Sequence, residues 1–367
     1  MQYRRFGKTN LNLSVFSLGT MRCLENADRL HQVLTAAVER GINHIETARG
    51  YGQSERYLGQ ALRNFARADL TLTTKLLPGS DVDRLIDDSL ERLETSYIDC
   101  LAVHGVNTPE HLHQVQAMEP GLAKVLDDGR VRHVGASTHG SLEVVMAAIA
   151  TPIFSFINLH YYFFNQRNAA AIELAHQRDL GIFIISPADK GGQLYTPPER
   201  LTALCAPFEP LGLTYRWLLS DPRITTLSMG PATPAELDWP LQMADSTAPL
   251  SAEEQTALDK LVQTQRTALG TEHCRQCYDC LPCPEAIHIP EVLRLRNLAV
   301  AFDMNQFGQY RYGMFERAGH WFPGHKGSRC TDCGDCLPRC PEQLDIPTLL
   351  RDTHQRLKGT ERRRLWG

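Results

Sequence analysis

The stretch Asp28–Thr47, DRLHQVLTAAVERGINHIET, determines the fold that this sequence predicts. In its first part, Asp28–Arg40, apolar residues recur at the spacing i, i+3, i+4, i+7 and i+8, which places them on one face of a helix. These residues are Leu30, Val33, Leu34, Ala37 and Val38. The second part, Ile42–Thr47, is a short apolar run typical of a buried strand. The stretch therefore predicts a helix followed by a strand.

The same alternation of apolar runs and amphipathic segments occurs eight times before about residue 245. The strand candidates are Val15–Gly19, Ile42–Thr47, Leu70–Lys75, Ile98–His104, His133–Ser137, Phe154–His160, Gly181–Ser186 and Thr226–Gly230. Eight strand-then-helix units over about 250 residues are typical of a closed (β/α)₈ TIM barrel. A doubly wound sheet is the alternative, but it rarely needs eight such regular units. We therefore predict an α/β fold built on this barrel.

Eight of the eleven cysteines lie in two runs near the C-terminus. The first run is CRQCYDCLPC (Cys274–Cys283) and the second is CTDCGDCLPRC (Cys330–Cys340), each followed by proline. The second run matches the C-x₂-C-x₂-C-x₃-C-P pattern of ferredoxins that bind two [4Fe-4S] clusters, in which the fourth cysteine ligates the other cluster. The first run is one residue shorter before its last cysteine. The spacing therefore predicts two [4Fe-4S] clusters with exchanged fourth ligands.

The expected ligand sets are Cys274, Cys277 and Cys280 with Cys340, and Cys330, Cys333 and Cys336 with Cys283. Structural zinc is a weaker interpretation, because it usually takes two CxxC pairs that are well separated in sequence. A disulfide framework is weaker still, because the N-terminus lacks the apolar core of a secretory signal.

Composition excludes several classes of function. The chain has 367 residues and a net charge of −4 with acids and bases interspersed, which does not indicate a nucleic-acid groove or an anionic membrane surface. No run approaches the ~18 apolar residues of a membrane span. Cysteines placed as cluster ligands suit a reducing compartment, so we expect a cytoplasmic protein that binds neither nucleic acid nor membrane.

A further helical pattern covers residues 251–269, and Gly270 then marks a boundary before the cysteines. We expect a barrel domain over residues 1–269. Residues 270–367 are expected to form a small, mainly helical, ferredoxin-like iron–sulfur domain.

Polar side chains follow three successive strand candidates, at the strand ends where barrel enzymes place their active sites. Glu46 and Tyr51 follow the second strand, Lys75 ends the third and His104 ends the fourth. An ammonium beside a phenol favours phenolate, so we expect Lys75 to lower the pKa of Tyr51. Tyr51 would then act as a general acid, while His104 would orient a carbonyl oxygen.

The sequence resembles the aldo-keto reductases, and more narrowly the bacterial branch with a C-terminal ferredoxin-like domain. The resemblance lies in Tyr3–Thr9 (YRRFGKT), Ser17–Thr20 (SLGT) and Gly41–Gly52 (GINHIETARGYG), the last followed by Ser54-Glu55. It implies a (β/α)₈ barrel and hydride exchange between NADPH and a carbonyl or alcohol substrate. The family's Asp, Tyr, Lys and His fall on Glu46, Tyr51, Lys75 and His104, so that Glu46 replaces an aspartate.

The resemblance also implies a nicotinamide cofactor site at the later strand ends. Its residues are Ser137, Asn158, Ser186, Gly191, Ser228 and Gly230. The family's usual Lys or Arg for a 2′-phosphate is missing, since no basic residue occurs between Arg223 and Lys260. The sequence therefore leaves NADP and NAD both open as the cofactor.

Two classes of function fit these observations. The first is an aldo-keto reductase-like oxidoreductase that carries two [4Fe-4S] clusters. The second is an electron-transfer or redox-sensing iron–sulfur protein on a barrel whose hydride chemistry has degenerated. No flavin motif links two-electron hydride chemistry to one-electron clusters, which leaves room for an external one-electron donor as a partner.

Overall fold

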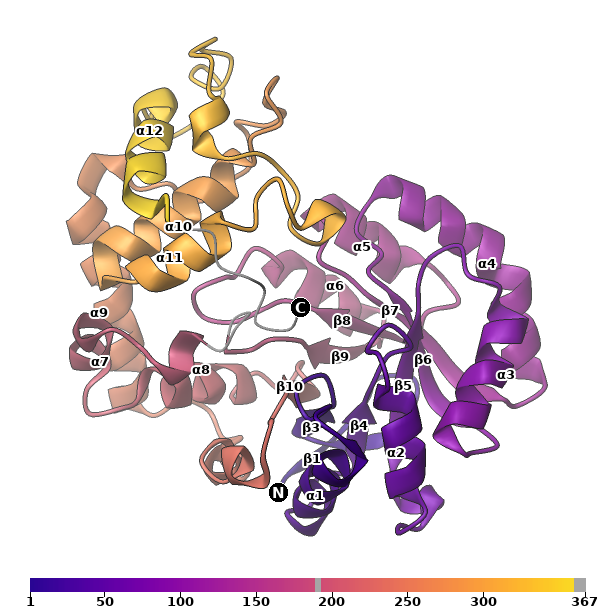
Figure 1. Ribbon diagram of the computed structural model, residues 1–367. Coiled ribbons are helices and arrows are strands. Elements are labelled where there is room, and N and C mark those ends of the chain that lie inside the picture. The colour runs from indigo at the N-terminus through magenta and orange to yellow at the C-terminus, as the bar shows by residue number, and fades with distance from the viewer. Residues whose placement is uncertain (189–192, 360–367) are drawn as a thin grey trace. The chain divides into compact units, whose positions relative to one another are not determined.

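Eight parallel strands form a closed barrel in the order β10-β3-β4-β5-β6-β7-β8-β9 (Figure 1). The structure is a computed structural model, and it describes residues 1–188 and 193–359. The strands are β3 (Phe16–Gly19), β4 (His44–Glu46), β5 (Thr71–Leu76), β6 (Ile98–His104), β7 (Val131–Ser137), β8 (Phe156–Leu159), β9 (Gly181–Ile184) and β10 (Thr226–Met229). Each overlaps one predicted strand, which confirms the predicted barrel.

Helices follow the strands along the chain, as the alternating pattern predicts. They are α1 (Ala27–Glu39), α2 (Ser54–Leu62), α3 (Val82–Leu93), α4 (Pro109–Asp127), α5 (Leu142–Ala150), α6 (Ala169–Gln177), α7 (Glu199–Cys205) and α8 (Pro210–Leu219). In α1, Leu30, Val33 and Leu34 are fully buried, as the expected apolar face requires. The Asn26 side chain accepts a hydrogen bond from the Arg29 N–H and so begins this helix.

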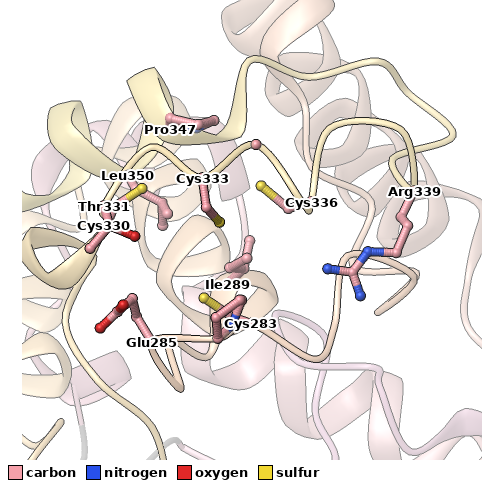
Figure 2. A pocket seen from close by; sticks show the side chains of 12 residues that line it. Cys283, Glu285, Ile289, Cys330, Thr331, Cys333, Cys336, Arg339, Pro347 and Leu350 are labelled. Atoms are coloured by element: carbon pink, nitrogen blue, oxygen red, sulfur yellow. The ribbon is translucent and has the colours of Figure 1, made fainter.

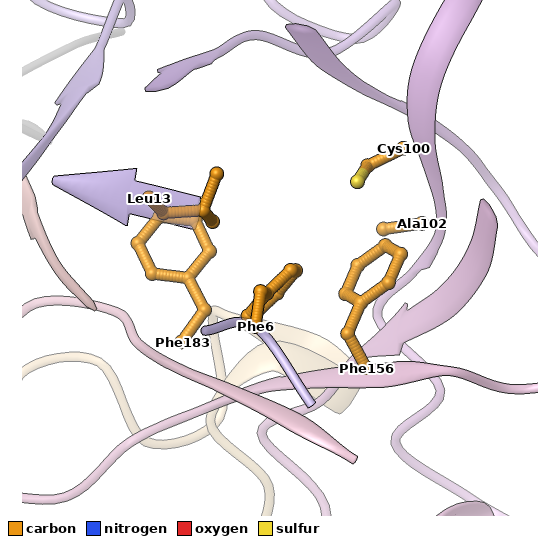
Figure 3. Close-up of a cluster of buried hydrophobic side chains, with 6 residues drawn as sticks. All are labelled: Phe6, Leu13, Cys100, Ala102, Phe156 and Phe183. Atoms are coloured by element: carbon orange, nitrogen blue, oxygen red, sulfur yellow. The ribbon is translucent and has the colours of Figure 1, made fainter. Parts of the chain in front are cut away.

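A two-stranded hairpin closes the N-terminal end of the barrel. It consists of β1 (Tyr3–Arg5) and β2 (Asn12–Ser14), which pair in antiparallel fashion and were not among the predicted elements. Leu13 of β2 and Phe6, which follows β1, belong to a buried cluster with barrel side chains (Figure 3), namely Cys100, Ala102, Phe156 and Phe183. At Gly7 a Cβ atom would lie 2.2 Å from the Gly181 nitrogen, so only glycine allows this close approach.

A network of four hydrogen-bonded polar side chains spans four strands inside the barrel. His44 on β4 contacts Ser17 Oγ on β3 at 2.6 Å and Thr73 Oγ1 on β5 at 2.7 Å. Ser17 Oγ also lies 2.6 Å from Thr226 Oγ1 on β10. Burial, followed by the charge of Lys75, lowers the pKa of His44 to about 3, so the imidazole is neutral at ordinary pH.

The chain divides into two compact units. One contains Met1–Pro187 and Thr214–Pro249, and the other contains Ala188–Leu213 and Leu250–Gly367. The second unit includes α9 (Ala252–Leu269), α10 (Ile289–Phe302), α11 (Asn305–Tyr312) and α12 (Ile346–Leu357), and α10 packs against the other three. This helical region is confirmed. The helix α9, which we assigned to the barrel domain, groups here with α10.

Short 3₁₀ segments complete the described secondary structure. They are η1 (Arg67–Asp69), η2 (Gln193–Tyr195), η3 (Pro234–Leu237), η4 (Pro240–Met243), η5 (Gly270–Glu272), η6 (Gly319–Trp321) and η7 (Gly327–Arg329). Across residues 1–188 and 193–359, no helix is both long enough and apolar enough to cross a membrane.

Candidate active site and cysteine loops

The predicted catalytic residues lie at the C-terminal ends of neighbouring strands. Glu46 ends β4, Lys75 is the last but one residue of β5, and His104 ends β6. Tyr51 lies in the loop between β4 and α2. The structure therefore places all four residues at the end of the barrel where barrel enzymes have their active sites.

Lys75 is the centre of this group. Its Nζ forms an ion pair with Glu46 Oε1 at 2.5 Å and donates hydrogen bonds to the Thr47 carbonyl at 2.8 Å and to the Tyr51 hydroxyl at 3.4 Å. Lys75 and Glu46 are buried, with exposed fractions of 2% and 5%. A buried ammonium needs such compensation, because water no longer solvates it. The role of the Thr47 carbonyl was not foreseen, since its residue type carries no signal for it.

The direction of the Tyr51 pKa differs from our expectation. Burial raises the pKa of Tyr51; the charge of Lys75 lowers it in part, and the Glu46 carboxylate raises it again. For Lys75, burial acts to lower the pKa, but Glu46 and Tyr51 outweigh it and leave the pKa raised. The phenol therefore holds its proton more firmly than free tyrosine, and the predicted lowering is wrong for the chain's own groups. Glu46 offsets the cation on which that prediction depended.

His104 lies against the phenol. The rings of Tyr51 and His104 meet edge to face, with centroids 5.7 Å apart and an interplanar angle of 81°. The imidazole and the phenol therefore lie side by side at the strand ends.

Two sets of contacts hold the loop that carries Tyr51. The Ser54 hydroxyl lies 2.7 Å from both Thr20 Oγ1 and Thr47 Oγ1. Arg49 reaches from the loop to α3, where it pairs with Asp88 at 2.8 Å. Sequence reasoning missed Arg49, because its partner is 39 residues away in the chain.

Two of the expected cofactor residues, Ser137 and Asn158, lie side by side on β7 and β8. His104 pairs in register with Ser137 on β7, and Ser137 pairs with Asn158 on β8. Asn158 is fully buried, and neither atom of its side-chain amide has a hydrogen-bond partner in the described part of the chain. Since buried amides are rarely left without partners, Asn158 marks a place for a polar ligand group.

The remaining cofactor candidates follow the last two strands. Ser186 follows β9 with a left-handed φ of 52°. Ser228 lies in β10 and Gly230 directly follows it, whereas Gly191 lies outside the described residues. Strand β10 lies between β3 and β9, so Ser228 and Gly230 lie at its C-terminal end between these two strands.

A cation lies beside Gly230 that the local sequence did not reveal. Arg22, from the loop after β3, donates to the Gly230 carbonyl at 2.8 Å and pairs with Glu236 at 2.8 Å. The Glu236 carboxylate also accepts the Ala232 N–H at 3.1 Å. Arg22 therefore supplies a positive charge near the segment after β10, but Glu236 already neutralises it.

Four cysteines from both runs surround one cavity in the second unit (Figure 2). They are Cys330, Cys333 and Cys336 of the second run and Cys283 of the first. Burial, and after it the Cys330, Cys333 and Cys283 thiols, raises the pKa of Cys336, which agrees with this grouping. The last cysteine of the first run thus joins the second run, as expected for exchanged fourth ligands.

The other four cysteines form the complementary group. Burial is the main cause that raises the pKa of Cys274 to about 11, and the Cys277 and Cys340 thiols add to it. For Cys280 the pKa is raised to about 12 by burial and then by Cys274 and Cys277. Cys340 therefore lies near the cysteines of the first run, just as Cys283 lies near those of the second.

The two cysteine loops repeat one backbone conformation. Two and four residues after the first cysteine, Gln276 and Tyr278 have φ of 57° and 70°, and Asp332 and Gly334 have φ of 57° and 80°. Cys277 and Cys333 are exposed, while Cys280 and Cys336 are buried. All eleven cysteines are unbridged thiols. Across the described residues, no three His, Cys, Asp or Glu side chains gather tightly enough to hold a single metal ion. Four of the thiols line one cavity together.

The fold and the strand-end residues define a barrel enzyme, and comparison with known proteins gives the family. The sequence model of the aldo/keto reductase family matches residues 16–202, and that of a 4Fe-4S dicluster domain matches residues 273–344. The chain belongs to the aldo/keto reductase family of oxidoreductases and carries a C-terminal 4Fe-4S dicluster domain.

Individual relatives are distant. The chain is 26% identical over 208 residues to "Uncharacterized oxidoreductase YqkF" of Bacillus subtilis, which covers 52% of this chain and 66% of that protein. It is 28% identical over 158 residues to "Aldo-keto reductase YhdN" of the same organism, covering 37% and 47%. The chain thus spans about half to two thirds of the length of these curated relatives.

Among solved structures, the aldo-keto reductase AKR11C1 from Bacillus halodurans in its holo form is similar, with a TM-score of 0.61 at 22% identity. The likeness covers 71% of this chain and 96% of that one, and it supports the fold.

Proposed function

We propose that this protein is a nicotinamide-dependent oxidoreductase that exchanges hydride with a small carbonyl or alcohol substrate. The observation that carries the proposal is the buried ion pair of Lys75 and Glu46, whose ammonium donates to the Tyr51 hydroxyl. A buried ammonium fixed on a phenol stabilises the phenolate that remains after the phenol gives up its proton.

The residues present fit a nicotinamide cofactor, NAD or NADP. The unpartnered amide of Asn158 offers one donor and one acceptor group, which complements a carboxamide, and Ser137 lies beside it in register. When bound, nicotinamide supplies or accepts the hydride. Ser186, Ser228 and Gly230, together with Gly191, would hold the remainder of the cofactor.

The chain's own residues then carry the proton. The Tyr51 hydroxyl gives its proton to the carbonyl oxygen in the direction of reduction and recovers it in the direction of oxidation. Lys75 stabilises the charge left on the Tyr51 oxygen, and Glu46 keeps Lys75 charged in its buried position. The His104 imidazole, against the Tyr51 ring, orients the substrate oxygen.

We further propose that residues 270–367 bind two [4Fe-4S] clusters. One would be held by Cys330, Cys333, Cys336 and Cys283, which surround one cavity. The other would be held by Cys274, Cys277, Cys280 and Cys340. Such clusters supply one-electron chemistry, which leaves an external one-electron donor as a partner.

Titration of the purified protein with NADH and NADPH, followed by nicotinamide fluorescence, tests the cofactor proposal. We expect saturable binding that weakens by at least ~10-fold in Asn158→Leu, because a carboxamide would then lose both partners. The matched control is Asn64→Leu, in the segment between α2 and η1, which should bind as the natural protein does. The absence of binding to either nucleotide would contradict the proposal.

A second candidate function is electron transfer or redox sensing through the clusters alone. The pairing of Arg22 with Glu236 favours it, because this cation, which contacts Gly230 in the described part of the chain, is already compensated and so attracts a cofactor phosphate less. Protein that binds iron, but neither nicotinamide nucleotide, would establish this second function in place of the first.

A further inference from the structure

The second cysteine run contains one residue more than the first, and that residue is Arg339. It stands between Pro338 and Cys340, whereas in the first run Pro282 is followed directly by Cys283. Arg339 lines the cavity that Cys283 and the second run surround. Figure 2 shows its side chain extending from its loop toward the side of the cavity where Cys336 and Cys283 lie.

Two hydrogen bonds hold the guanidinium in this position. Arg339 Nε donates to the Asp335 carbonyl at 2.8 Å, and Nη2 donates to the Pro282 carbonyl at 2.9 Å. Both acceptors are neutral backbone groups, so no carboxylate on these contacts cancels the charge. The cation is therefore fixed at the cavity by uncharged partners.

One further charged residue lines this cavity, and two acidic residues of the second run, Asp332 and Asp335, stand next to its cysteines. Glu285 also lines the cavity. Asp332, next to Cys333, forms an ion pair with Arg351 of α12. The remaining lining from α10 and α12 is apolar and includes Ile289, Pro347 and Leu350. Arg339 and Glu285 are thus the two charged residues, of opposite sign, that line the cavity itself.

The other cysteine group has no counterpart of Arg339. Its first loop carries Arg275, which is 69% exposed and pairs with Glu342 at 3.3 Å. Solvent and an ion-pair partner both weaken the field of such a charge. The extra residue therefore makes the electrostatic surroundings of the two cysteine groups unequal.

We propose that Arg339 raises the reduction potential of the cluster held by Cys283, Cys330, Cys333 and Cys336, whose cavity it lines, more than that of the other cluster. Reduction adds one negative charge to a cluster, and a fixed cation beside it stabilises the reduced form. Glu285 acts on the same cluster in the opposite direction. This inference rests on the proposed binding of two clusters and adds that the chain sets their potentials separately.

The experiment is a redox titration of the full-length, anaerobically purified protein, followed by electron paramagnetic resonance and iron analysis. In Arg339→Gln, one of the two reduction steps should move to lower potential by more than the other. We expect the ratio of reduced to oxidised cluster at a fixed potential to fall about tenfold, which is ~59 mV for a one-electron couple. Glu285→Gln should move the same step upward.

Two further variants separate charge from loop structure. Arg339→Lys keeps the cation and should retain the potential, although it loses the forked contacts. Arg356→Gln removes one positive charge from the other end of α12, about 13 Å along the helix from Pro347, and should move neither step.

The inference is overturned if Arg339→Gln holds about eight irons and both steps stay in place, or if both shift equally. It is also overturned if Arg339→Lys shifts as far as Arg339→Gln, because the effect would then come from the lost contacts. Colourless natural protein without iron would overturn the proposed function itself and, with it, this inference.

Discussion

The Tyr51 hydroxyl is the atom on which the proposed chemistry depends, and three opposing influences act on it. Burial and the Glu46 carboxylate raise the pKa of Tyr51, and the Lys75 ammonium lowers it. The balance leaves a phenol that keeps its proton at neutral pH, as a proton donor for carbonyl reduction must. In the reverse direction, an alcohol must lose its proton to a site that is costly to ionise. The raised pKa of Tyr51 therefore suits the proton donation that the proposed reduction requires.

Replacement of Tyr51 by phenylalanine removes this proton donor and keeps the ring against His104. We expect turnover with a small aldehyde to fall by at least ~10²-fold, the usual scale of general acid catalysis. Nicotinamide binding should stay within about twofold, since the ring remains in place. Steady-state kinetics and fluorescence titration measure the two quantities. A Tyr51→Phe enzyme with natural turnover would show that another group carries the proton.

The buried ion pair predicts an asymmetry between two replacements of Glu46. Glu46→Gln leaves the Lys75 ammonium buried without a counter-charge, and breaking such a pair costs about 3–5 kcal/mol of the free energy of unfolding. Glu46→Asp keeps the charge and restores the family residue, so activity should be retained. Urea unfolding of both variants checks this expectation. Equal stability of Glu46→Gln and the natural protein would mean that Lys75 is uncharged in the folded state.

At this scale the sequence predicted which catalytic residues meet, but not how they influence one another. Glu46, Lys75 and His104 end successive strands, so the barrel pattern alone brings them together. The sign of the Tyr51 pKa shift depends on burial, which results from packing that a linear pattern does not show. Arg22 was missed for a related reason, because its partner Glu236 is 214 residues away.

Among the elements, the strands around His44 show how the barrel interior accommodates a polar layer. Four strands supply Ser17, His44, Thr73 and Thr226, and the hydroxyls occupy both ring nitrogens of the imidazole. These contacts suit a neutral ring, which agrees with a His44 pKa lowered from 6.5 to about 3. The network joins β3, β4, β5 and β10 in hydrogen bonds that are additional to the strand ladder.

A neutral buried histidine makes stability depend on pH in a defined direction. The unfolded chain protonates His44 below about pH 6.5, whereas the folded chain does so only near pH 3. The contribution of neutral His44 to the free energy of unfolding is therefore complete above pH 6.5. It is lost as the pH falls toward 3, at about 1.4 kcal/mol per pH unit.

Urea unfolding at several pH values between 4 and 7 measures this slope. His44→Gln should lower this slope by about 1.4 kcal/mol per pH unit, which corresponds to one proton. His113→Gln, at a site 73% exposed on α4, should leave the slope unchanged. Identical slopes for the natural protein and His44→Gln would show that His44 is charged or solvated in the folded barrel.

The elements themselves were predictable where they bury a continuous apolar run. Strands such as β6 (Ile98–His104) and β7 (Val131–Ser137) show such runs, and the sequence places them within two residues of their observed ends. The hairpin of β1 and β2 could not be found this way, because each strand has three residues and β1 is largely exposed. Its register depends on Phe6 and Leu13, whose burial is a property of the closed barrel.

In the whole molecule, the proposed function combines two kinds of redox chemistry in one chain. Hydride transfer moves two electrons at once, and a [4Fe-4S] cluster accepts one. A flavin normally converts between them, and the sequence shows no flavin motif. We therefore expect that the clusters chiefly stabilise their own unit, in which the first cysteine loop precedes α10 and the second precedes α12.

Exchanged ligation makes a prediction about how the two clusters depend on single cysteines. Cys283 belongs to the first run by sequence but lines the cavity of the second. Cys283→Ser should therefore lose the same cluster as Cys333→Ser and leave the one that Cys277→Ser removes, with iron falling from about eight to about four per chain. Iron analysis and the paramagnetic resonance of reduced protein distinguish the two clusters. If Cys283→Ser instead reproduced the spectrum of Cys277→Ser, each run would bind its own cluster.

The same variants show what the clusters do for the fold of their unit. Helix α12 begins beside the cavity, with Pro347 and Leu350 in its lining, so loss of the cluster removes part of what fixes its first turns. Amide hydrogen exchange in Cys283→Ser should quicken in α12 and in the loop of Cys330–Cys340, because local stability follows local packing. Strand β6, in the first unit, provides the internal control, and its amides should remain protected. Unchanged exchange in α12 after cluster loss would show that its contacts with α10 alone hold it. The clusters would then serve electron transfer without a structural role.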